Sequence, residues 1–535
     1  MAPWSLIAIS TAVLLVSVKP EYSLRHSYTW TAAAFVAVTL LCRFIYSAIL
    51  YPEFLTLLKH LPTPPGRSWI KGNTQSMFLD SPGQRARKWI ETVPNNGLIR
   101  YYTVGNMERV LITSPKALSE VLVTRSYEFP KTELARAQLQ RLTGNGLLLA
   151  EGDEHKTQRK SLMPAFSYRH IKDLYPIYWA KGIEMVKAIE KELPSHDNIV
   201  EVRDWAGRTM LDILGVAGLG HDFGSIQDPN NELSRTYREL IIEPSPFLKA
   251  LLLIGIWFVG FRTIMKLPLK RNRDLQAGAE YIRTVARQII REKKAKLERN
   301  EVGGVDILSA ALTSGTFSEE NLVDQMMTFL AAGHETTATA LQWSVYALCK
   351  NPEIQSRLRD EVRANLPPIS TDDPVPVTAA AVDSLPYLNA FINEVLRFYP
   401  PVPITVRDVT HDTTIVGCRI PKGTVLILSP EATNRDRNLW GPDAGEFKPE
   451  RWLGPGRANS GGANSNYSML TFIHGPRSCI GQGFAKSELA CVLATVVGRF
   501  EMELKDPDAE LKIRSTVTQA PLDGVIARFK VVEGW

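Results

Sequence analysis

The chain has 535 residues, of which 44% are hydrophobic and 22% are charged, and this ordinary globular balance excludes a disordered or collagen-like protein. Its formal net charge of +6 is thinly spread, and no run of Lys and Arg is dense enough to indicate nucleic-acid binding. The five cysteines are scattered and none forms a C-x-x-C pair, which argues against a disulfide framework and suits a reducing compartment.

Two apolar runs open the chain. Residues 4–18 are short for a membrane span, whereas residues 30–50 are interrupted only by Arg43 and match the roughly 20 apolar residues that cross a bilayer as a helix. We therefore predict a membrane anchor within residues 1–60, with 30–50 as the better span, and one span or a hairpin of two as open alternatives. A cleaved signal peptide fits less well, because the start lacks a basic segment and a clear cleavage site. A third run, 251–261, is too short to span and predicts either a core segment or one that dips into the membrane interface.

Residues 61–535 form the predicted folded domain. It begins with residues 61–66, whose three prolines predict a stiff, extended spacer after the anchor. Helical periodicity then dominates from about Ser114 to about Tyr399. Short strand-like segments flank this region, at 98–104, 109–113, 413–420 and 424–428. We therefore expect a mainly α domain with small β-sheets.

The central chemical feature is a cysteine at the mouth of a predicted helix. Residues 472–481 read F-I-H-G-P-R-S-C-I-G, and helical periodicity follows over 482–499. Unpaired backbone N–H groups and the positive end of the helix dipole stabilise a thiolate there, and a thiolate is the form that binds metal. A buried, inert cysteine is the rival interpretation of Cys479. The spacing F-x-x-G-x-R-x-C-x-G fixes five positions, however, and chance would produce it in this chain with a probability on the order of 10⁻⁴.

The neighbours of Cys479 suit a flat, anionic ligand. Gly475 and Gly481 permit a sharp turn and a close approach of the backbone to a flat group, Phe472 can cover the sulfur, and Arg477 offers a fixed cation. Together these residues resemble the haem-binding loop of the cytochrome P450 superfamily. The resemblance implies that Cys479 is the axial ligand of the iron of haem b, where a thiolate favours O–O cleavage.

A second motif of that family lies upstream. Glu394 and Arg397 are spaced i, i+3 and therefore share one face of a predicted helix, although such a pair alone is usually a weak surface contact. Residues 447–452 follow with the sequence F-K-P-E-R-W. The resemblance implies that Arg451 joins Glu394 and Arg397 in a buried structural triad that supports the cysteine loop.

Residues 318–350 predict one long helix, which begins after the N-cap Ser318 and ends before Pro352. Its centre reads A-G-H-E-T-T, and Gly and paired Thr are poor helix formers whose hydroxyls can bond back to the carbonyl four residues earlier and bend the helix. A small-residue packing patch would also explain this composition. The family pattern A-G-x-(D/E)-T-T implies instead a local opening over the haem, in which Thr336 hydrogen-bonds the oxygen ligand of the iron and Glu335 relays protons from solvent.

Three arginines are candidates for the two haem propionates, because buried carboxylates need cations or donors. They are Arg477, Arg159 and Arg407. Arg159 lies in a segment that resembles the family's W-x-x-x-R helix, with His155 in place of the tryptophan. We expect His155 to donate to a propionate, with a solvent-exposed histidine as the alternative, and a surface charge is the alternative for each arginine.

The resemblance covers about residues 60–535 and implies a monooxygenase that inserts one atom of dioxygen into a lipophilic small molecule. Hydroxylation of a secondary-metabolite intermediate (a terpenoid, polyketide or alkaloid) is expected, with epoxidation or multistep oxidation as alternatives. Electrons would come from NADPH through a flavoprotein reductase, with cytochrome b5 as a second candidate donor. The anchor implies the endoplasmic-reticulum membrane, with the catalytic domain facing the cytosol. No nucleic-acid partner is expected.

Two other classes of function fit a haem-thiolate protein. One is an isomerase or dehydratase that acts on peroxides without activating dioxygen, and the other is a non-catalytic haem- or lipid-binding membrane protein. The presence of Glu335 and Thr336 argues against both, because a proton relay would then have no purpose.

Overall fold

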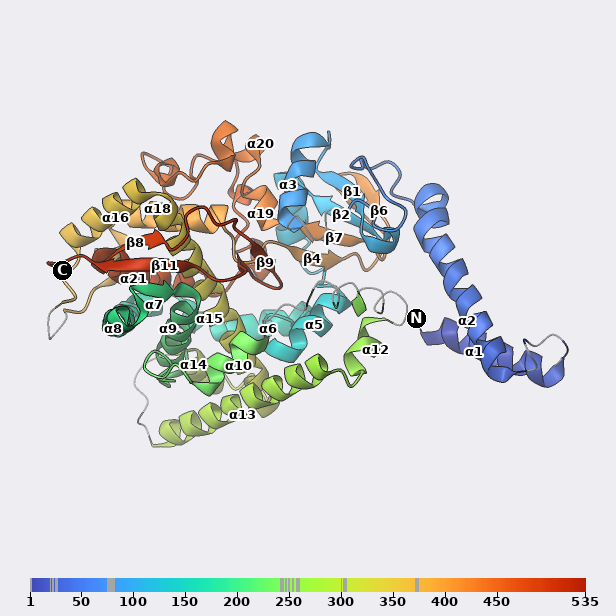
Figure 1. Cartoon of the computed structure of the whole chain (residues 1–535), viewed down its shortest axis with the longest axis horizontal. Coiled ribbons are helices and arrows are strands. Elements are labelled where there is room, and N and C mark those ends of the chain that lie inside the picture. Colours follow the sequence, from blue (N-terminus) through green and yellow to red (C-terminus); the bar gives the residue numbers. More distant parts are fainter. Residues whose placement is uncertain are drawn as a thin grey trace.

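The structure, a computed structural model, describes residues 2–19, 21, 24, 27–74, 82–240, 245, 248, 251, 252, 255, 260–299, 301, 306–370 and 375–535. Within these ranges, helices build most of the molecule and four small sheets lie among them (Figure 1). This confirms the expected mainly α fold. Most of the apolar run 251–261 lies outside the described residues.

The longer helices are α1 (Ala2–Val18), α2 (Tyr28–Ile45), α3 (Pro82–Thr92), α5 (Glu133–Thr143), α6 (Gly152–Leu162), α8 (Tyr175–Glu192), α9 (Val202–Ile213), α10 (Glu232–Leu240), α13 (Lys270–Glu298), α15 (Glu319–Lys350), α16 (Pro352–Asn365), α18 (Pro386–Phe398) and α21 (Gln482–Arg499). The strands are β1 (Leu98–Tyr102), β2 (Glu108–Ile112), β3 (Ile199–Glu201), β4 (Thr405–Asp408), β5 (Thr413–Ile415), β6 (Cys418–Ile420), β7 (Val425–Leu428), β8 (Phe500–Leu504), β9 (Ile513–Ser515), β10 (Gln519–Pro521) and β11 (Ile526–Val531).

The sheets have short strands, and two of them interrupt others along the chain: β5–β6 lies between β4 and β7, and β9–β10 lies between β8 and β11. The largest has the strand order β1-β2-β7-β4, the next has the order β3-β11-β8, and β5–β6 and β9–β10 are two-stranded. The segment 413–420, predicted as one strand, is the hairpin β5–β6. It turns at Val416 and Gly417, whose φ angles of 45° and 80° break the extended run.

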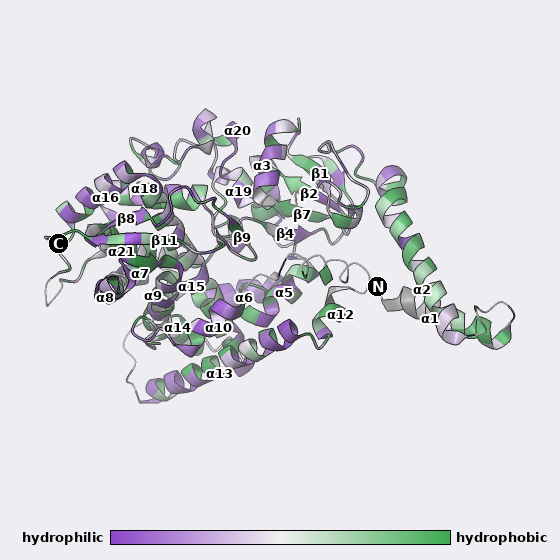
Figure 2. Ribbon diagram, viewed as in Figure 1, coloured by the Kyte–Doolittle hydropathy of each residue, from purple (hydrophilic) through white to green (hydrophobic). Residues whose placement is uncertain are grey.

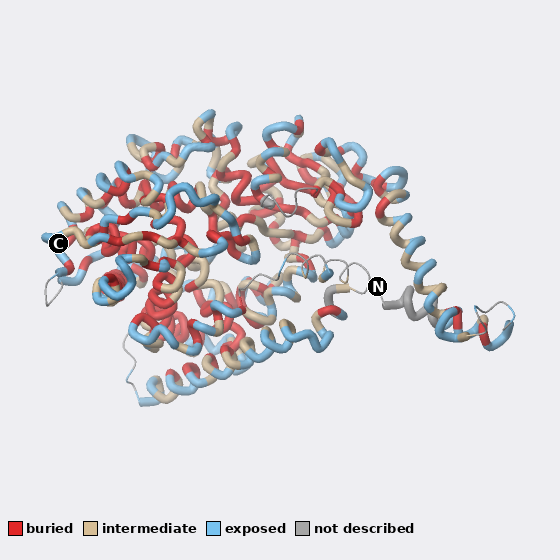
Figure 3. The backbone as a smooth tube through the Cα atoms, in the orientation of Figure 1, coloured by how far each residue is buried: buried red, intermediate tan, exposed pale blue. Residues whose placement is uncertain are grey.

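Helix α15 runs through the centre of the helical part and packs against α5, α9, α13 and α21. Buried residues fill much of the interior that these helices enclose (Figure 3), and those of α15 fall into two separate clusters, one toward each end of the helix. The helix begins where the sequence predicts, because the Ser318 hydroxyl accepts the N–H of Asn321 at 3.2 Å and two acidic residues occupy its first turn. It ends at Lys350, just ahead of Pro352. Helix α21 likewise spans the predicted residues 482–499.

The predicted anchor projects from the rest of the chain as the paired helices α1 and α2 (Figure 1). Helix α2 is apolar along most of its length (Figure 2) and continues into the π-helix η3 (Tyr46–Leu55). Together they form a helix of 28 residues, Tyr28–Leu55, in which an 18-residue window has a mean hydropathy of 2.0. Among the described residues, this is the one helix long and apolar enough to cross a membrane, and the predicted span 30–50 lies within it.

The anchor helix is hydrogen-bonded directly to the folded domain. Asn106 is buried in the β1–β2 connection and donates from Nδ2 to the carbonyl of Ala48 at 2.6 Å and to that of Trp69 at 2.9 Å. Pro52 has no N–H, so in an α-helical pattern it would leave the Ala48 carbonyl without its partner, and Asn106 supplies a donor there. The carbonyl of Pro52 itself accepts from the Tyr102 hydroxyl at 3.4 Å.

The proline-rich segment 61–66, predicted as a stiff spacer, packs along β1. Leu61 is buried, and the carbonyl of Pro62 accepts from the N–H of Arg100 on β1 at 2.8 Å. The guanidinium of Arg100 also donates to the Thr63 hydroxyl at 3.0 Å. The anchor helix is already hydrogen-bonded to the domain at Ala48 and Pro52, before this segment begins. The stiffness of the segment therefore favours its packing along β1.

Candidate functional site

Cys479 lies on the loop that precedes α21, two residues before the N-cap of that helix. The loop is closed by a hydrogen bond of 2.9 Å from the N–H of Cys479 to the carbonyl of Phe472. Ile473 has a φ of 58°, which is costly for a β-branched residue and persists only where the surrounding structure enforces it. A tightly held turn therefore presents the sulfur at the mouth of the helix.

Cys479 is an exposed residue, yet protein atoms surround its thiol closely enough to change the pKa. Burial is the main influence on the thiol and raises its pKa. The sulfur therefore faces a recess inside the protein. The N–H of Gly481 and the guanidinium of Arg159 act in the opposite direction and lower the pKa. Burial raises the thiol pKa more than the helix N-terminus lowers it, contrary to the prediction from the sequence. A metal ion that replaced the thiol proton would stabilise the thiolate.

The two glycines of the loop differ in what they require. Gly475 has a φ of 78°, and a Cβ added there would lie 2.2 Å from the carbonyl oxygen of Leu122. Gly481 has a φ of −88°, and its added Cβ would meet nothing closer than Phe166, at 3.8 Å. The protein itself therefore demands glycine at Gly475, where the loop turns. Gly481 lies in a turn that its ordinary φ does not reserve for glycine, and the fold alone would tolerate a side chain there.

Arg477 extends into an interior cluster of charges. Its Nη1 bonds the carboxylate of Glu151, and its Nη2 donates to the carbonyl of Ala150 at 2.9 Å. Its Nε is buried and has no hydrogen-bond partner among the described residues. Arg407 is also buried and donates within its own strand β4, to a hydroxyl at 2.9 Å and a carbonyl at 2.8 Å. Neither arginine is the surface charge that the sequence left as an alternative.

In the cluster of Arg477, Arg407, Lys131 and Glu151, the positive charges outnumber the negative ones. Burial, followed by the charge of Arg477, lowers the pKa of Arg407 to about 10. Burial also lowers the pKa of Lys131 well below its usual range, with Arg407 and Arg477 as further causes. Glu151 is the one carboxylate among the charged neighbours that shift these two pKa values in the described part of the chain. Buried cations without partners are costly, so the cluster favours a ligand that brings carboxylates.

His155 and Arg159 both lie on α6. His155 is buried, which excludes the solvent-exposed alternative, and its Nδ1 is 3.1 Å from the Tyr127 hydroxyl. Burial, followed by the charge of Arg477, lowers the pKa of His155 to about 4, so its ring is neutral at pH 7. Arg159 donates from Nη1 to the carbonyl of Ser478 at 2.7 Å and thereby braces the residue before the cysteine.

Glu394, Arg397 and Arg451 meet in the interior. Arg397 Nη2 and Arg451 Nε lie 2.7 Å and 3.1 Å from the same oxygen of Glu394, and the Trp452 indole donates to the other oxygen at 2.9 Å. The side chains of Glu394 and Arg397 are fully buried. This excludes the weak surface pair, and the many hydrogen bonds offset the desolvation of the charges.

Helix α15 is continuous across the motif at its centre. The Thr336 hydroxyl donates to the carbonyl of Ala332 at 2.8 Å, and the Thr337 hydroxyl donates to that of Gly333 at 3.2 Å, as the sequence predicts. These bonds do not interrupt the helix, so the predicted opening is absent from its backbone. Because the single hydroxyl proton of Thr336 is engaged, its oxygen is left as an acceptor.

Glu335 faces the C-terminal hairpin β9–β10. Its Oε1 accepts from Arg514 Nη2 at 3.2 Å and from the Thr518 hydroxyl at 3.0 Å. The Glu335 side chain is 21% exposed and that of Arg514 is 8% exposed, so solvent reaches the carboxylate from one side only. The preceding residue, His334, is buried and packs its ring against Tyr237.

Cys479 offers a single ligand to a metal. In the part of the chain that the structure describes, no group of three or more His, Cys, Asp and Glu side chains is arranged to hold a metal ion. The five cysteines, all of them described, are unpaired. A metal at Cys479 would therefore take its remaining ligands from a prosthetic group.

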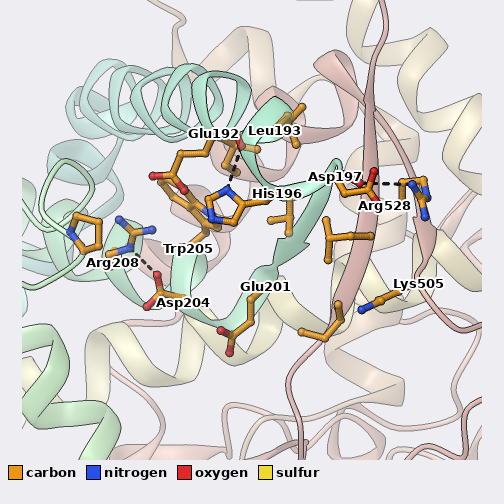
Figure 4. A pocket seen from close by; sticks show the side chains of 15 residues that line it. Glu192, Leu193, His196, Asp197, Glu201, Asp204, Trp205, Arg208, Lys505 and Arg528 are labelled. Carbon is orange, nitrogen blue, oxygen red and sulfur yellow. Dashed lines mark hydrogen bonds and ion pairs between the residues drawn. The ribbon is translucent and has the colours of Figure 1, made fainter.

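A separate surface cavity of about 550 Å³ lies between η8 (Leu193–His196), β3, α9 and β11 (Figure 4). Its charged groups bond one another or nearby backbone: Arg208 Nε is 2.9 Å from Asp204 Oδ2, and Arg528 donates to the carbonyl of Asp197 at 3.4 Å. None of its lining residues belongs to the cysteine loop, the cation cluster or α15. We assign it no part in the chemistry.

Four residues that the sequence motifs do not reveal contribute to the site. They are Glu151, Lys131, Asn434 and Arg514, and each contacts or influences site residues brought close by the fold. The position of Glu151, directly before the helix that carries His155 and Arg159, is the one sequence signal among them. The other three stand in no recognisable pattern.

Comparison with known proteins identifies extensive similarity. The cytochrome P450 family model matches residues 62–526. The chain is 54% identical over 522 residues to cytochrome P450 monooxygenase sphH of Aspergillus fumigatus, which covers 97% of this chain and 96% of that protein. It is 44% identical over 517 residues to cytochrome P450 monooxygenase FSL4 of Gibberella zeae, with 92% of each chain covered. It is 41% identical over 538 residues to cytochrome P450 monooxygenase FUM15 of Gibberella moniliformis, with 91% and 90% covered.

Proposed function

Since this chain belongs to the cytochrome P450 family and is a haem-dependent monooxygenase, we propose that it hydroxylates a lipophilic intermediate of secondary metabolism, such as a terpenoid, polyketide or alkaloid. In the balanced reaction, one substrate molecule, one dioxygen, one NADPH and one proton yield the hydroxylated product, one water and NADP⁺. A flavoprotein reductase would deliver the NADPH electrons, with cytochrome b5 as a second donor. The apolar helix Tyr28–Leu55 supports placement at the endoplasmic-reticulum membrane, with the catalytic domain in the cytosol.

The residues around Cys479 fit haem. Bound there, haem would supply an iron centre that activates dioxygen, with the cysteine thiolate as an electron-rich ligand that favours O–O cleavage. The recess at the Cys479 sulfur would receive the flat group. Arg477, Arg407 and Lys131 would meet its two propionates, because they form a buried cluster with surplus positive charge and Arg477 Nε lacks a partner.

Further side chains would hold this arrangement. Arg159 braces the loop through Ser478. Neutral His155 on the same helix would donate from Nε2 in the tautomer whose Nδ1 accepts the Tyr127 hydroxyl. We propose that the triad of Glu394, Arg397 and Arg451 is structural and keeps the loop in place from behind. The carbonyl of Phe472 accepts the N–H of Cys479, which keeps the two residues close together. The side chain of Phe472 would limit access of water to the sulfur.

We propose that Thr336 and Glu335 handle the protons that oxygen activation consumes. The Thr336 hydroxyl donates to a helix carbonyl, so it must rotate to present its proton elsewhere and then needs a replacement. Glu335 is the adjacent carboxylate with partial access to solvent, which suits it to supply that replacement. The isomerase, dehydratase and non-catalytic alternatives find no support among the relatives, which are named monooxygenases.

The observation that carries the proposal is the sulfur of Cys479 in its interior recess at the mouth of α21. The test is the absorption spectrum of the reduced protein with carbon monoxide, which should show the red-shifted Soret band of a thiolate ligand. Cys479→Ala should abolish this band. Cys491→Ala is the control, because Cys491 is buried in the packed face of α21. A band that survives the loss of Cys479 would overturn the assignment.

The substrate class and electron donor need a second experiment. Membranes that contain the chain and an NADPH-dependent flavoprotein reductase should add one oxygen atom to a member of a terpenoid, polyketide and alkaloid panel, detected by mass spectrometry. Omission of the reductase should stop turnover. If a protein with the normal carbon monoxide band oxidised none of these compounds, the proposed substrate class alone would be refuted.

A further inference from the structure

The hairpin β9–β10 is fastened to the central helix at two levels. Trp343, roughly two turns beyond Glu335 on α15, donates from its indole to the carbonyl of Gln519 at 2.8 Å. The N–H of Gln519 in turn donates to the carbonyl of Pro401 at 2.8 Å. Arg514 lies in the paired part of the same hairpin and reaches Glu335. These bonds therefore hold the hairpin in one position against α15.

The Glu335 contact is more than a surface ion pair. Two donors from the hairpin, Arg514 and Thr518, converge on one carboxylate oxygen. Thr518 and Arg514 are both buried, which reduces screening by water. A charge-assisted contact in such surroundings fixes a side chain more firmly than an exposed pair does. It determines which way the carboxylate points.

We propose that Arg514 and Thr518 are positioning residues for proton supply: they hold the Glu335 carboxylate in one orientation beside Thr336, so that directed proton entry depends on a docked hairpin. The inference rests on the proposed roles of Glu335 and Thr336. It adds the means by which a segment almost 180 residues further along the chain sets the orientation of the acid.

The balance of protons and electrons gives this proposal a measurable signature. Dioxygen that takes up two electrons and two protons leaves as hydrogen peroxide, whereas four electrons and four protons convert it to two molecules of water. Each NADPH brings two electrons and one proton, and the other protons come from solvent. The yield of peroxide per NADPH therefore rises when protons are poorly directed.

The experiment uses the full-length haem-loaded protein in lipid nanodiscs, with a flavoprotein reductase and NADPH. Arg514→Met and Glu335→Gln should each raise the peroxide yield roughly threefold to tenfold, and Thr518→Val should raise it less. Arg514→Lys, which keeps the charge, should recover much of the normal yield. The variant with both Arg514→Met and Glu335→Gln should be no worse than Glu335→Gln alone, because the two residues act as one unit.

Two further measurements separate positioning from general damage. The carbon monoxide band and the dissociation constant of clotrimazole, a lipophilic azole probe, should stay unchanged in Arg514→Met. Hydrogen exchange of the amides of residues 513–521 should rise in Glu335→Gln as it does in Arg514→Met, although Glu335 lies on another element. Arg528→Met is the matched control, since Arg528 pairs with a glutamate on a strand outside the site.

A peroxide yield for Arg514→Met equal to that of Arg528→Met would overturn the inference. So would a double variant whose increase in peroxide yield equals the product of the increases in Arg514→Met and Glu335→Gln. Either result would leave the proposed function standing. A wild-type protein without the carbon monoxide band would instead overturn the proposed function and this inference together.

Discussion

Arg397 and Asn434 join the buried triad to the cysteine loop. Arg397 donates from Nη1 to the carbonyl of Asn434 at 2.8 Å, and Asn434 Nδ2 donates back to the carbonyl of Arg397 at 3.2 Å. The same amide accepts the N–H of Leu470 at 2.7 Å and donates to the Thr471 hydroxyl at 2.8 Å. One buried side chain therefore links α18 to the segment that leads into Cys479.

Asn434→Ala should destabilise the protein and loosen the cysteine loop. It leaves several buried donors and acceptors without partners, which we expect to cost about 2–4 kcal/mol of unfolding free energy. Urea denaturation followed by the Soret band measures this loss. Asn365→Ala is the control, because Asn365 is exposed and bonds only within its own helix. Equal midpoints for the two variants would show that Asn434 has no such role.

Arg477→Met should weaken haem retention. It removes one of the cations that would meet the propionates and leaves the carboxylate of Glu151 without its ion-pair partner. We expect haem transfer from the ferric protein to apomyoglobin to accelerate by roughly 10- to 100-fold, as for other residues that support a metal site. Arg419→Met, which removes an exposed arginine paired with Asp412, should transfer haem at the wild-type rate. A normal rate for Arg477→Met would contradict the assignment.

The two loop glycines should respond differently to alanine. Gly475→Ala forces a Cβ against the Leu122 carbonyl in a left-handed conformation, and we expect a loss of about 3 kcal/mol or more, with little haem protein recovered. Gly481→Ala should cost under about 1 kcal/mol of protein stability, because its φ is ordinary and space is available. Soluble yield and urea midpoints distinguish the two cases. Similar losses in both variants would refute the distinction.

Glu488 should make stability fall as pH rises. Its carboxyl is buried in α21 beside Thr337, and burial raises its pKa well above the usual 4.5. Between that value and the raised one, the folded state binds more protons than the unfolded chain, so the free energy of unfolding decreases with increasing pH in this window. Glu488→Gln removes the ionisable group and should stabilise the protein by about 1–3 kcal/mol near pH 8, but less near pH 5.5.

The measurement for Glu488 is the urea midpoint of each variant at both pH values. Glu501→Gln serves as the control, because Glu501 is exposed on β8 and pairs with Lys530 at the surface. Its midpoints should follow those of the wild type. A gain for Glu488→Gln of equal size at both pH values would mean that ionisation is not its cause.

The parts of the fold that the sequence predicts are those determined locally. The limits of α15 follow from the Ser318 cap and from Pro352, and those of α21 follow from its apolar periodicity after Gly481. The hairpin within 413–420 was missed because Val416 adopts a positive φ that its residue type does not announce. A turn of this kind is stabilised by its neighbours and not by its own propensity.

In the candidate site, the sequence predicts residue types but not their partners. Cys479 and Arg477 stand in a recognisable spacing, whereas nothing in the sequence pairs Glu335 with Arg514 or joins Arg397 to Asn434. These contacts bridge segments far apart in the chain, and hydrogen bonding between them depends on how helices and hairpins pack. Polar partners of this kind leave no periodic signal.

The bonds from Asn106 and Tyr102 to the end of the anchor helix have a mechanical consequence. A helix that crosses a bilayer adjusts its tilt to the thickness of the hydrocarbon layer. Because these bonds hold the helix directly against β1 and the β1–β2 connection, a change of tilt would move the catalytic domain with the helix. The depth at which the domain meets lipid-dissolved molecules would then vary with membrane thickness, so the composition of the bilayer would influence which molecules the enzyme encounters.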